Sequence, residues 1–200
     1  MTSRRLNRIV RDWTLPLLLL LFLIVARSTL ADHYHVPSGS MENALLPGDH
    51  VLVNKSAYGL RIPFTRHVFA LRSDPVHGEI VILDSPEDEV RLIKRVVAVG
   101  GDRVSLLNGR LTVNGRQLAS PYDPFVEQIG TRRVALNLAE GGGPDIPETT
   151  VPEGHVLLLG DHRGASRDGR WFGTVPVESI YGRATRVFWR SGEGPSWIPL

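Results

Sequence analysis

Two short stretches of the chain contain side chains that together could perform nucleophilic catalysis. The first is Val-Pro-Ser-Gly-Ser-Met at 36–41, where Ser40 follows a glycine in a turn. The second is Arg-Leu-Ile-Lys-Arg-Val-Val at 91–97, where Lys94 lies inside an apolar, β-branched run. A serine hydroxyl is a weak nucleophile that needs a base, and a lysine amine is a base only when neutral. Because burial lowers a lysine pKa, a core strand around Lys94 would let it serve Ser40.

Each of these residues also has an ordinary structural explanation. Ser-Gly-Ser is common loop composition, and a lone lysine in a strand often protects a sheet edge from aggregation. Side chains alternate along a strand, so Lys94 and Leu92 share one face while Ile93 and Arg95 share the other. We therefore expect Lys94 to point inward and Arg95 to point away.

A third polar run, Gly-Asp-His-Arg-Gly-Ala-Ser-Arg-Asp-Gly-Arg at 160–170, follows an apolar strand pattern. We expect Asp168 and Arg170 to pair and hold this loop, and Ser166 to hydrogen-bond the Lys94 amine. Ser38 could direct its hydroxyl at a developing oxyanion, beside a backbone N–H. The alternative is a surface loop with exposed salt bridges, which contribute little to stability.

From residue 49 onward the pattern predicts β-structure that would position these side chains. Short runs rich in Val, Ile and Leu predict strands at 50–54, 79–83, 90–99, 104–107, 155–159 and 181–189. The Asn-Gly pairs at 108–109 and 114–115 predict tight turns, the first a two-residue hairpin. Proline and glycine interrupt 118–152. We therefore expect a catalytic β core at 32–117 and 153–190, an inserted lobe at 118–152 and a C-terminal tail at 191–200.

The pattern of the N-terminal residues predicts that the chain is exported across, or inserted into, the cytoplasmic membrane. Arginines at 4, 5, 8 and 11 precede a segment at 13–31 whose 19 positions contain one charge, Arg27. A spanning helix needs about 20 apolar residues, and Arg27 could reach the interface. The positive-inside rule would then keep 1–12 in the cytoplasm and place the later chain outside. The alternative is a cleaved secretory signal with small residues at 29 and 31.

The composition excludes several kinds of chemistry. The 200 residues, 42% of them hydrophobic, can bury one sizeable core, and a net charge of +2 gives no argument for nucleic acid. The absence of cysteine excludes disulfides and cysteine nucleophiles. No His-Glu-x-x-His run appears, so we do not expect metal-dependent hydrolysis. Ser–Lys chemistry requires neither a metal nor another cofactor, and we expect none. A Ser–His–Asp triad that pairs Ser40 with His155 or with Asp161 and His162 stays open.

Taken in order, these stretches resemble the sequence boxes of bacterial type I signal peptidases, which are membrane-anchored Ser–Lys proteases. The residues at 37–49 are similar to the nucleophile box, those at 77–82 to a strand box, those at 92–102 to the lysine box and those at 160–170 to the last box. The run at 58–64 also resembles proteobacterial members. The chain departs from the usual pattern at Asn43, Ala44, Gly100, His162 and Gly169.

The resemblance implies a role for each matching position. Ser40 would be the nucleophile, Lys94 the general base and Ser38 an oxyanion donor, with Ser166, Asp168 and Arg170 as supports. Shallow pockets for small side chains would be lined by Val36, Met41, Leu45, Leu92 and Ile93. The implied fold is mainly β, an all-β catalytic core with a small inserted β region after one N-terminal transmembrane helix.

The implied function is a membrane-bound serine endopeptidase that removes signal peptides from exported precursor proteins. It would be a monomer in contact with lipid, on the periplasmic face of the bacterial inner membrane. One alternative is a specialised peptidase of the same chemistry for a single exported substrate, such as a pilin or a conjugation protein. Another is an inactive membrane-tethered binding module, although a copy without activity would often have lost one of the four central side chains.

Overall fold

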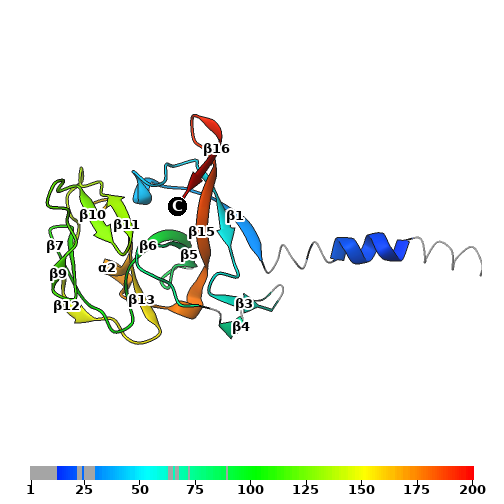
Figure 1. Ribbon diagram of the computed structural model, residues 1–200, viewed down its shortest axis with the longest axis horizontal. Coiled ribbons are helices and arrows are strands. Elements are labelled where there is room, and N and C mark those ends of the chain that lie inside the picture. Colours follow the sequence, from blue (N-terminus) through cyan, green and yellow to red (C-terminus); the bar gives the residue numbers. More distant parts are fainter. Residues whose placement is uncertain are drawn as a thin grey trace, which may run out of the picture.

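Antiparallel strands make up the body of the molecule, as the Val- and Ile-rich runs predict (Figure 1). The computed structural model describes residues 13–21, 24, 30–62, 65, 68–71, 73–88 and 90–200. Each of the six predicted strands is present within one residue of its expected bounds. The strands are β1 (Ala31–His35), β2 (His50–Asn54), β3 (Gly59–Arg61), β4 (Val68–Leu71), β5 (Ile80–Asp84), β6 (Arg91–Val99), β7 (Arg103–Leu107), β8 (Arg110–Val113), β9 (Arg116–Gln117), β10 (Val126–Ile129), β11 (Arg132–Ala135), β12 (Ile146–Thr150), β13 (His155–Leu159), β14 (Val175–Pro176), β15 (Ile180–Arg190) and β16 (Gly194–Pro199). The short helical elements are η1 (Gly39–Met41), α2 (Gly169–Phe172) and η2 (Val177–Ser179).

The largest sheet holds the strand that carries Lys94. Its strand order is β1-β2-β15-β5-β6-β13-β14. The eighth strand, β16, pairs with β15 outside this order. Within it β6 lies between β5 and β13, and the register places Lys94 opposite Val81 and Arg95 opposite Ile80. A strand with a partner on both sides has its backbone groups satisfied, so β6 is a rigid support for the side chains it carries.

A second layer of strands lies at the end of the molecule farthest from the N-terminal helix (Figure 1). It contains the sheet β12-β7-β8-β9 and the two-stranded sheet β10-β11. The predicted hairpin is confirmed, because Leu107 pairs with Arg110 across the turn formed by Asn108 and Gly109. Since β12 pairs with β7, the strands at 103–117 share a sheet with part of 118–152. The division into core and inserted lobe stays a prediction.

Three apolar clusters form the core, and β6 contributes to all of them. Ile93 packs into the cluster beneath η1, Val96 into the cluster with β13 and β15, and Val97 into the cluster beneath β7 and β8. Fully burying an aliphatic side chain of this size contributes about 1.5–3 kcal/mol. Side chains on both faces of β6 thus pack into the core, and those in the cluster beneath β7 and β8 connect the two layers of the molecule.

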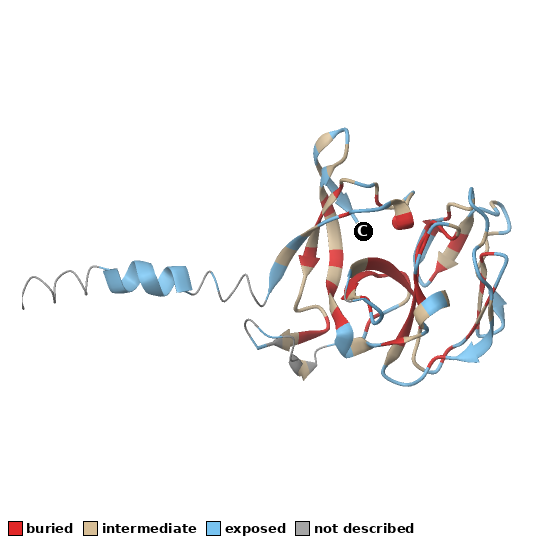
Figure 2. Cartoon of the chain, turned by 180° about the vertical axis from the view of Figure 1, so that it is seen from behind, coloured by how far each residue is buried: buried red, intermediate tan, exposed pale blue. Residues whose placement is uncertain are grey.

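The N-terminal segment is described in part. Residues 13–21 are helical and exposed along their length (Figure 2). Among the described residues, no helix is long and apolar enough to cross a membrane. The predicted cytoplasmic residues 1–12 lie outside the described residues, as does most of 22–29.

The two Asn-Gly turns allow a matched test of the packing between the layers. Gly109 and Gly115 have similar left-handed φ angles of 76° and 77°. A Cβ on Gly109 would lie 2.7 Å from the Gly142 Cα, whereas a Cβ on Gly115 would meet nothing within 4 Å. We expect Gly115→Ala to cost about 1 kcal/mol, for the left-handed backbone alone. Gly109→Ala should cost about 1–3 kcal/mol more, because the backbone at Gly142 must move.

Chemical unfolding of the two variants beside the wild type would measure this difference in the free energy of unfolding. Equal losses would mean that the hairpin and the loop at Gly142 are not in the close contact described.

Candidate active site

The structure brings the serine turn and the lysine strand together. η1 carries Ser40, β6 carries Lys94, and the Lys94 Nζ donates a hydrogen bond of 2.7 Å to the Ser40 Oγ. The same amine donates to the Ile93 carbonyl oxygen at 3.0 Å. Ser40 is 6% exposed and Lys94 is 2% exposed. The two side chains therefore form a hydrogen-bonded pair that is largely withdrawn from water.

Burial determines the protonation of this amine. Loss of solvent is the largest effect and lowers the pKa of Lys94, the carboxylates of Asp168 and Asp161 oppose the shift, and the positive charge of Arg170 adds to it, so that the pKa falls to about 8. A pKa near 8 leaves roughly one amine in ten neutral at pH 7. Lys94 can therefore accept a proton at physiological pH, which an exposed lysine rarely does.

Ser38 lies at the entrance to the serine turn. It is the residue before η1, its backbone is extended, and its side chain makes no capping hydrogen bond. The residue is exposed, so its hydroxyl is accessible from solvent. On the other side of the turn, the Ser40 carbonyl accepts a hydrogen bond of 3.1 Å from the His162 backbone N–H. The oxyanion role of Ser38 stays a prediction.

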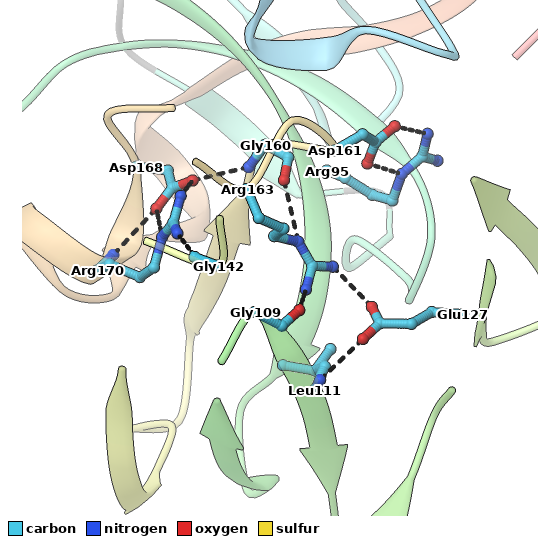
Figure 3. Close-up of polar contacts among 10 residues, drawn as sticks. All are labelled: Arg95, Gly109, Leu111, Glu127, Gly142, Gly160, Asp161, Arg163, Asp168 and Arg170. Atoms are coloured by element: carbon cyan, nitrogen blue, oxygen red, sulfur yellow. Dashed lines mark hydrogen bonds and ion pairs between the residues drawn. The ribbon is translucent and has the colours of Figure 1, made fainter. Parts of the chain in front are cut away.

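Asp168 and Arg170 form the pair that the sequence predicts, and they form it in the interior. Both side chains are 0% exposed, with Arg170 Nε 2.8 Å from Asp168 Oδ1 (Figure 3). Asp168 also accepts from the Gly160 N–H at 2.9 Å, and Arg170 donates to the Gly142 carbonyl at 2.7 Å. The alternative of an exposed salt-bridge loop is therefore wrong. The pair fixes the loop at 160–170 against its neighbours.

The expectation that Arg95 points away from the protein is also wrong. Its guanidinium forms a two-pronged pair with Asp161, with bonds of 2.8 and 2.6 Å, and donates to the Gly78 carbonyl at 2.7 Å. Both side chains are almost fully buried. The face of β6 opposite Lys94 is covered, so a charge there needs an ionic partner. The position of Arg95 inside an apolar run was a signal of a buried charge, but the run alone did not identify Asp161 as its ionic partner.

A third buried pair, which the sequence analysis missed, joins this loop to the second layer of strands. Arg163 Nη2 lies 2.6 Å from Glu127 Oε2, and the guanidinium also donates to the Gly109 and Gly160 carbonyls (Figure 3). Glu127 accepts from the Leu111 N–H at 2.8 Å. Both charged side chains are at most 1% exposed. In β10 the alternation of side chains places Glu127 on the same face as the buried Ile129, and this shared face was the only local signal that the carboxylate is buried.

The predicted hydrogen bond from Ser166 to Lys94 is absent. The Ser166 hydroxyl is buried and has no hydrogen-bond partner within the described part of the chain, because the amine is directed to Ser40 and Ile93. Ser166 nevertheless lies close to the site. A Cβ added to Gly160 would be 2.2 Å from the Ser166 Oγ and 2.5 Å from the Ser40 carbonyl oxygen. The orienting role of Ser166 stays a prediction.

Most of the residues predicted to line substrate pockets lie in the core. Val36, Met41, Leu45 and Ile93 are at most 2% exposed and pack together beneath η1, whereas Leu92 is half-buried. A side chain without accessible surface makes no contact with a substrate in this conformation. These four residues support the serine turn here, and the pocket-lining role stays a prediction.

The histidines do not form a triad with Ser40. The His162 ring lies between two carboxylates, with Nδ1 3.2 Å from Glu42 and Nε2 3.8 Å from Glu140. His155 Nδ1 lies 3.1 Å from the Glu153 carbonyl. Among the residues described, no histidine hydrogen-bonds the Ser40 hydroxyl, and no group of acidic or histidine side chains is arranged to hold a metal ion.

The buried pair at Arg95 leads to a stability prediction. Asp161→Asn removes the charge that compensates a buried guanidinium, so we expect the free energy of unfolding to fall by about 3–5 kcal/mol. The control is Glu87→Gln, which breaks the Arg167–Glu87 pair, where the Arg167 side chain is 65% exposed. An exposed pair contributes less than about 1 kcal/mol. Denaturant titration of both variants makes the comparison, and losses of similar size would contradict a buried role for Asp161.

The comparison with known proteins agrees with this geometry. A sequence model of the family described as "Signal peptidase, peptidase S26" matches residues 10–189. Signal peptidase I of Pseudomonas fluorescens is 31% identical, over 88% of this chain and 70% of its own. The enzyme of the same name from Pseudomonas aeruginosa is 32% identical, over 90% and 72%.

A crystal structure of a signal peptidase I from Enterococcus faecalis is 26% identical, with a TM-score of 0.40 over 56% of this chain and 97% of that chain. The family match spans nearly the whole chain and includes both the serine turn and the lysine strand. The chain therefore belongs to the signal peptidase family, peptidase S26, a family of serine endopeptidases.

Proposed function

We propose that this protein removes signal peptides from exported precursors, with Ser40 as the nucleophile and Lys94 as the general base. The observation that carries the proposal is the 2.7 Å hydrogen bond between two buried side chains, Lys94 Nζ and Ser40 Oγ. A nucleophile and its base within hydrogen-bond reach are the minimum for covalent catalysis of acyl transfer.

The reaction proceeds in two stages at this pair. Neutral Lys94 takes the hydroxyl proton as Ser40 Oγ attacks the scissile carbonyl carbon, which creates a tetrahedral oxyanion. The Ser38 hydroxyl and the Ser40 backbone N–H donate hydrogen bonds to that oxyanion. The intermediate collapses, Lys94 returns the proton to the leaving amine, and the signal peptide stays bound as an ester. A water molecule that Lys94 deprotonates then hydrolyses the ester and releases the peptide.

The buried ion pairs preserve the neutral form of the base. Asp161 and Asp168 are the carboxylates that raise the pKa of Lys94, and each is paired with an arginine, Arg95 or Arg170. A carboxylate neutralised by a guanidinium stabilises a nearby ammonium less than a lone carboxylate does. The pairs therefore position the loop at 160–170 and limit its electrostatic effect on the amine.

The substrate binds as an extended segment beside the site, with small side chains before the scissile bond. The segment at 13–31 anchors the domain to the membrane, so the protein acts at the bilayer surface, on the periplasmic face of the inner membrane. It acts there as a monomer. A precursor's signal peptide is itself apolar, so this location brings the cleavage site to Ser40. A specialised peptidase for one exported substrate would use the same chemistry. An inactive binding module is disfavoured by the hydrogen-bonded pair.

Replacement of either member of the pair should abolish catalysis. We expect Ser40→Ala and Lys94→Ala to cleave a precursor with an Ala-x-Ala site at less than about one thousandth of the wild-type rate. Lys55→Ala replaces the one other lysine of the chain and is the matched control, which should retain activity. The readout is gel-based cleavage by purified protein in detergent. A Lys94→Ala protein with normal turnover would rule out lysine as the base.

Activity should rise with pH, because only the neutral amine accepts a proton. With the pKa of Lys94 lowered to about 8, kcat/KM is expected to increase about 50-fold between pH 6 and pH 8 and to level off above pH 9. A pH series with one precursor measures this profile. A rate that is flat across the same interval would contradict a lysine base.

A further inference from the structure

A cavity of about 260 Å³ has four arginines in its wall. Its position is tied to both catalytic segments, because Asn43 and Ala44 closely follow Ser40 and Arg95 directly follows Lys94. The residues of the wall that matter here are Asn43, Ala44, Arg95, Arg132, Arg133 and Arg190.

The charge of this wall is only partly compensated. Arg95 is paired with Asp161, and Arg190 lies 3.5 Å from Asp49. Arg132 and Arg133 are exposed on β11 and form no ion pair within the described residues. Two of the four guanidiniums are therefore paired with carboxylate side chains, and Arg132 and Arg133 supply positive charge that no acidic side chain compensates in the described part of the chain.

One donor in this wall is also left without a partner. The Arg190 side chain is 11% exposed, and its Nε is buried with no hydrogen bond in the described part of the molecule. A buried N–H that lacks an acceptor costs free energy, and an anion in the cavity would relieve that cost. Guanidinium groups in such an arrangement match the geometry of a carboxylate.

The fold indicates which part of a precursor reaches the cavity. β1 follows the proposed anchor, and its Asp32 accepts a hydrogen bond from Tyr181, whose ring lies 4.0 Å from the Arg91 guanidinium. The start of β6 is therefore beside the anchor-proximal strand. From Arg91 the strand runs past Lys94 to Arg95, roughly 13 Å along its axis. A chain that leaves the membrane passes Arg91 first, so the segment after the scissile bond lies toward the cavity.

From this geometry we propose that the cavity binds an acidic side chain of the precursor, located in the mature segment shortly after the scissile bond. The inference rests on the proposed function, because it assigns a second binding site for the same substrate. Arg132 and Arg133 are the specificity-determining residues, since their charges are free to pair with an incoming carboxylate.

Two precursors test the proposal. They share an Ala-x-Ala site and differ only in glutamate or glutamine at the second to fourth positions after the scissile bond. With the full-length protein in detergent, kcat/KM should be about fivefold higher for the glutamate precursor. The ratio should fall to about one in Arg132→Gln/Arg133→Gln. It should stay near five in Arg103→Gln/Arg116→Gln, which removes the same charge from exposed positions of the neighbouring sheet.

The outcomes distinguish the acidic binding site from the peptidase function. Cleavage of both precursors at equal rates by the wild type would overturn the acidic site and leave the signal peptidase function intact. Failure of the folded wild type to cleave either one would overturn the function itself.

A third experiment distinguishes binding of the precursor by these arginines from binding of a lipid headgroup. In vesicles with and without phosphatidylglycerol, the double variant should change the glutamate-to-glutamine ratio in both. An equal loss on both precursors that appears only with phosphatidylglycerol would mean that the arginines bind a lipid headgroup, and the proposal would be wrong.

Discussion

An amine that has been taken out of water is the constraint on which this structure depends. Lys94 lies on a strand with neighbours on both sides, and its surroundings make the ammonium form unfavourable. The amine then needs a hydrogen-bond partner that suits its neutral form, and the Ser40 hydroxyl supplies one. The fold must keep water away from this point while it leaves the serine accessible to a peptide. The serine turn at the border between core and surface satisfies both demands.

Three buried arginine–carboxylate pairs hold the loop at 160–170, and two of them, at Asp161 and Asp168, also act on the charge of the amine (Figure 3). Buried ion pairs are weak contributors to stability, because desolvation offsets much of their attraction. Here the ion pairs mainly hold chain segments in position. Each guanidinium also donates to backbone carbonyls of other segments, so Arg95, Arg163 and Arg170 fix the loop to β6, to the β7–β8 hairpin and to the segment at Gly142. The loop in turn contacts the Ser40 backbone through His162.

The sequence was sufficient for the parts of this arrangement that depend on local pattern. Alternating and β-branched runs predict the strands, and Asn108-Gly109 predicts its hairpin because both positions adopt positive φ. Ser40 and Lys94 were identified by residue type in an unusual context, a lysine within an apolar strand and a serine in a packed turn. Family resemblance then joined the two stretches, which composition alone could not do.

The parts that the sequence did not predict are set by contacts between distant segments. Arg95 points into a covered face because β5, β6 and the 160–170 loop enclose it, and strand alternation contains no information about that enclosure. Glu127 is buried because Arg163 approaches from another element. Ser166 and Met41 lie near the site as expected, yet their detailed contacts follow from packing of the loop and the core.

The protonation of Lys94 is the central claim, and the chain permits it to be measured directly. Lys55 and Lys94 are the only lysines, so protein labelled with ¹³C at the lysine ε-carbon gives two resonances, and the Lys94→Ala variant identifies one. An NMR titration from pH 6 to pH 12 follows each amine separately. We expect the Lys94 resonance to titrate near pH 8. A midpoint near 10.4, the value of an unperturbed lysine, would show that the amine is charged at neutral pH and would contradict its role as the base.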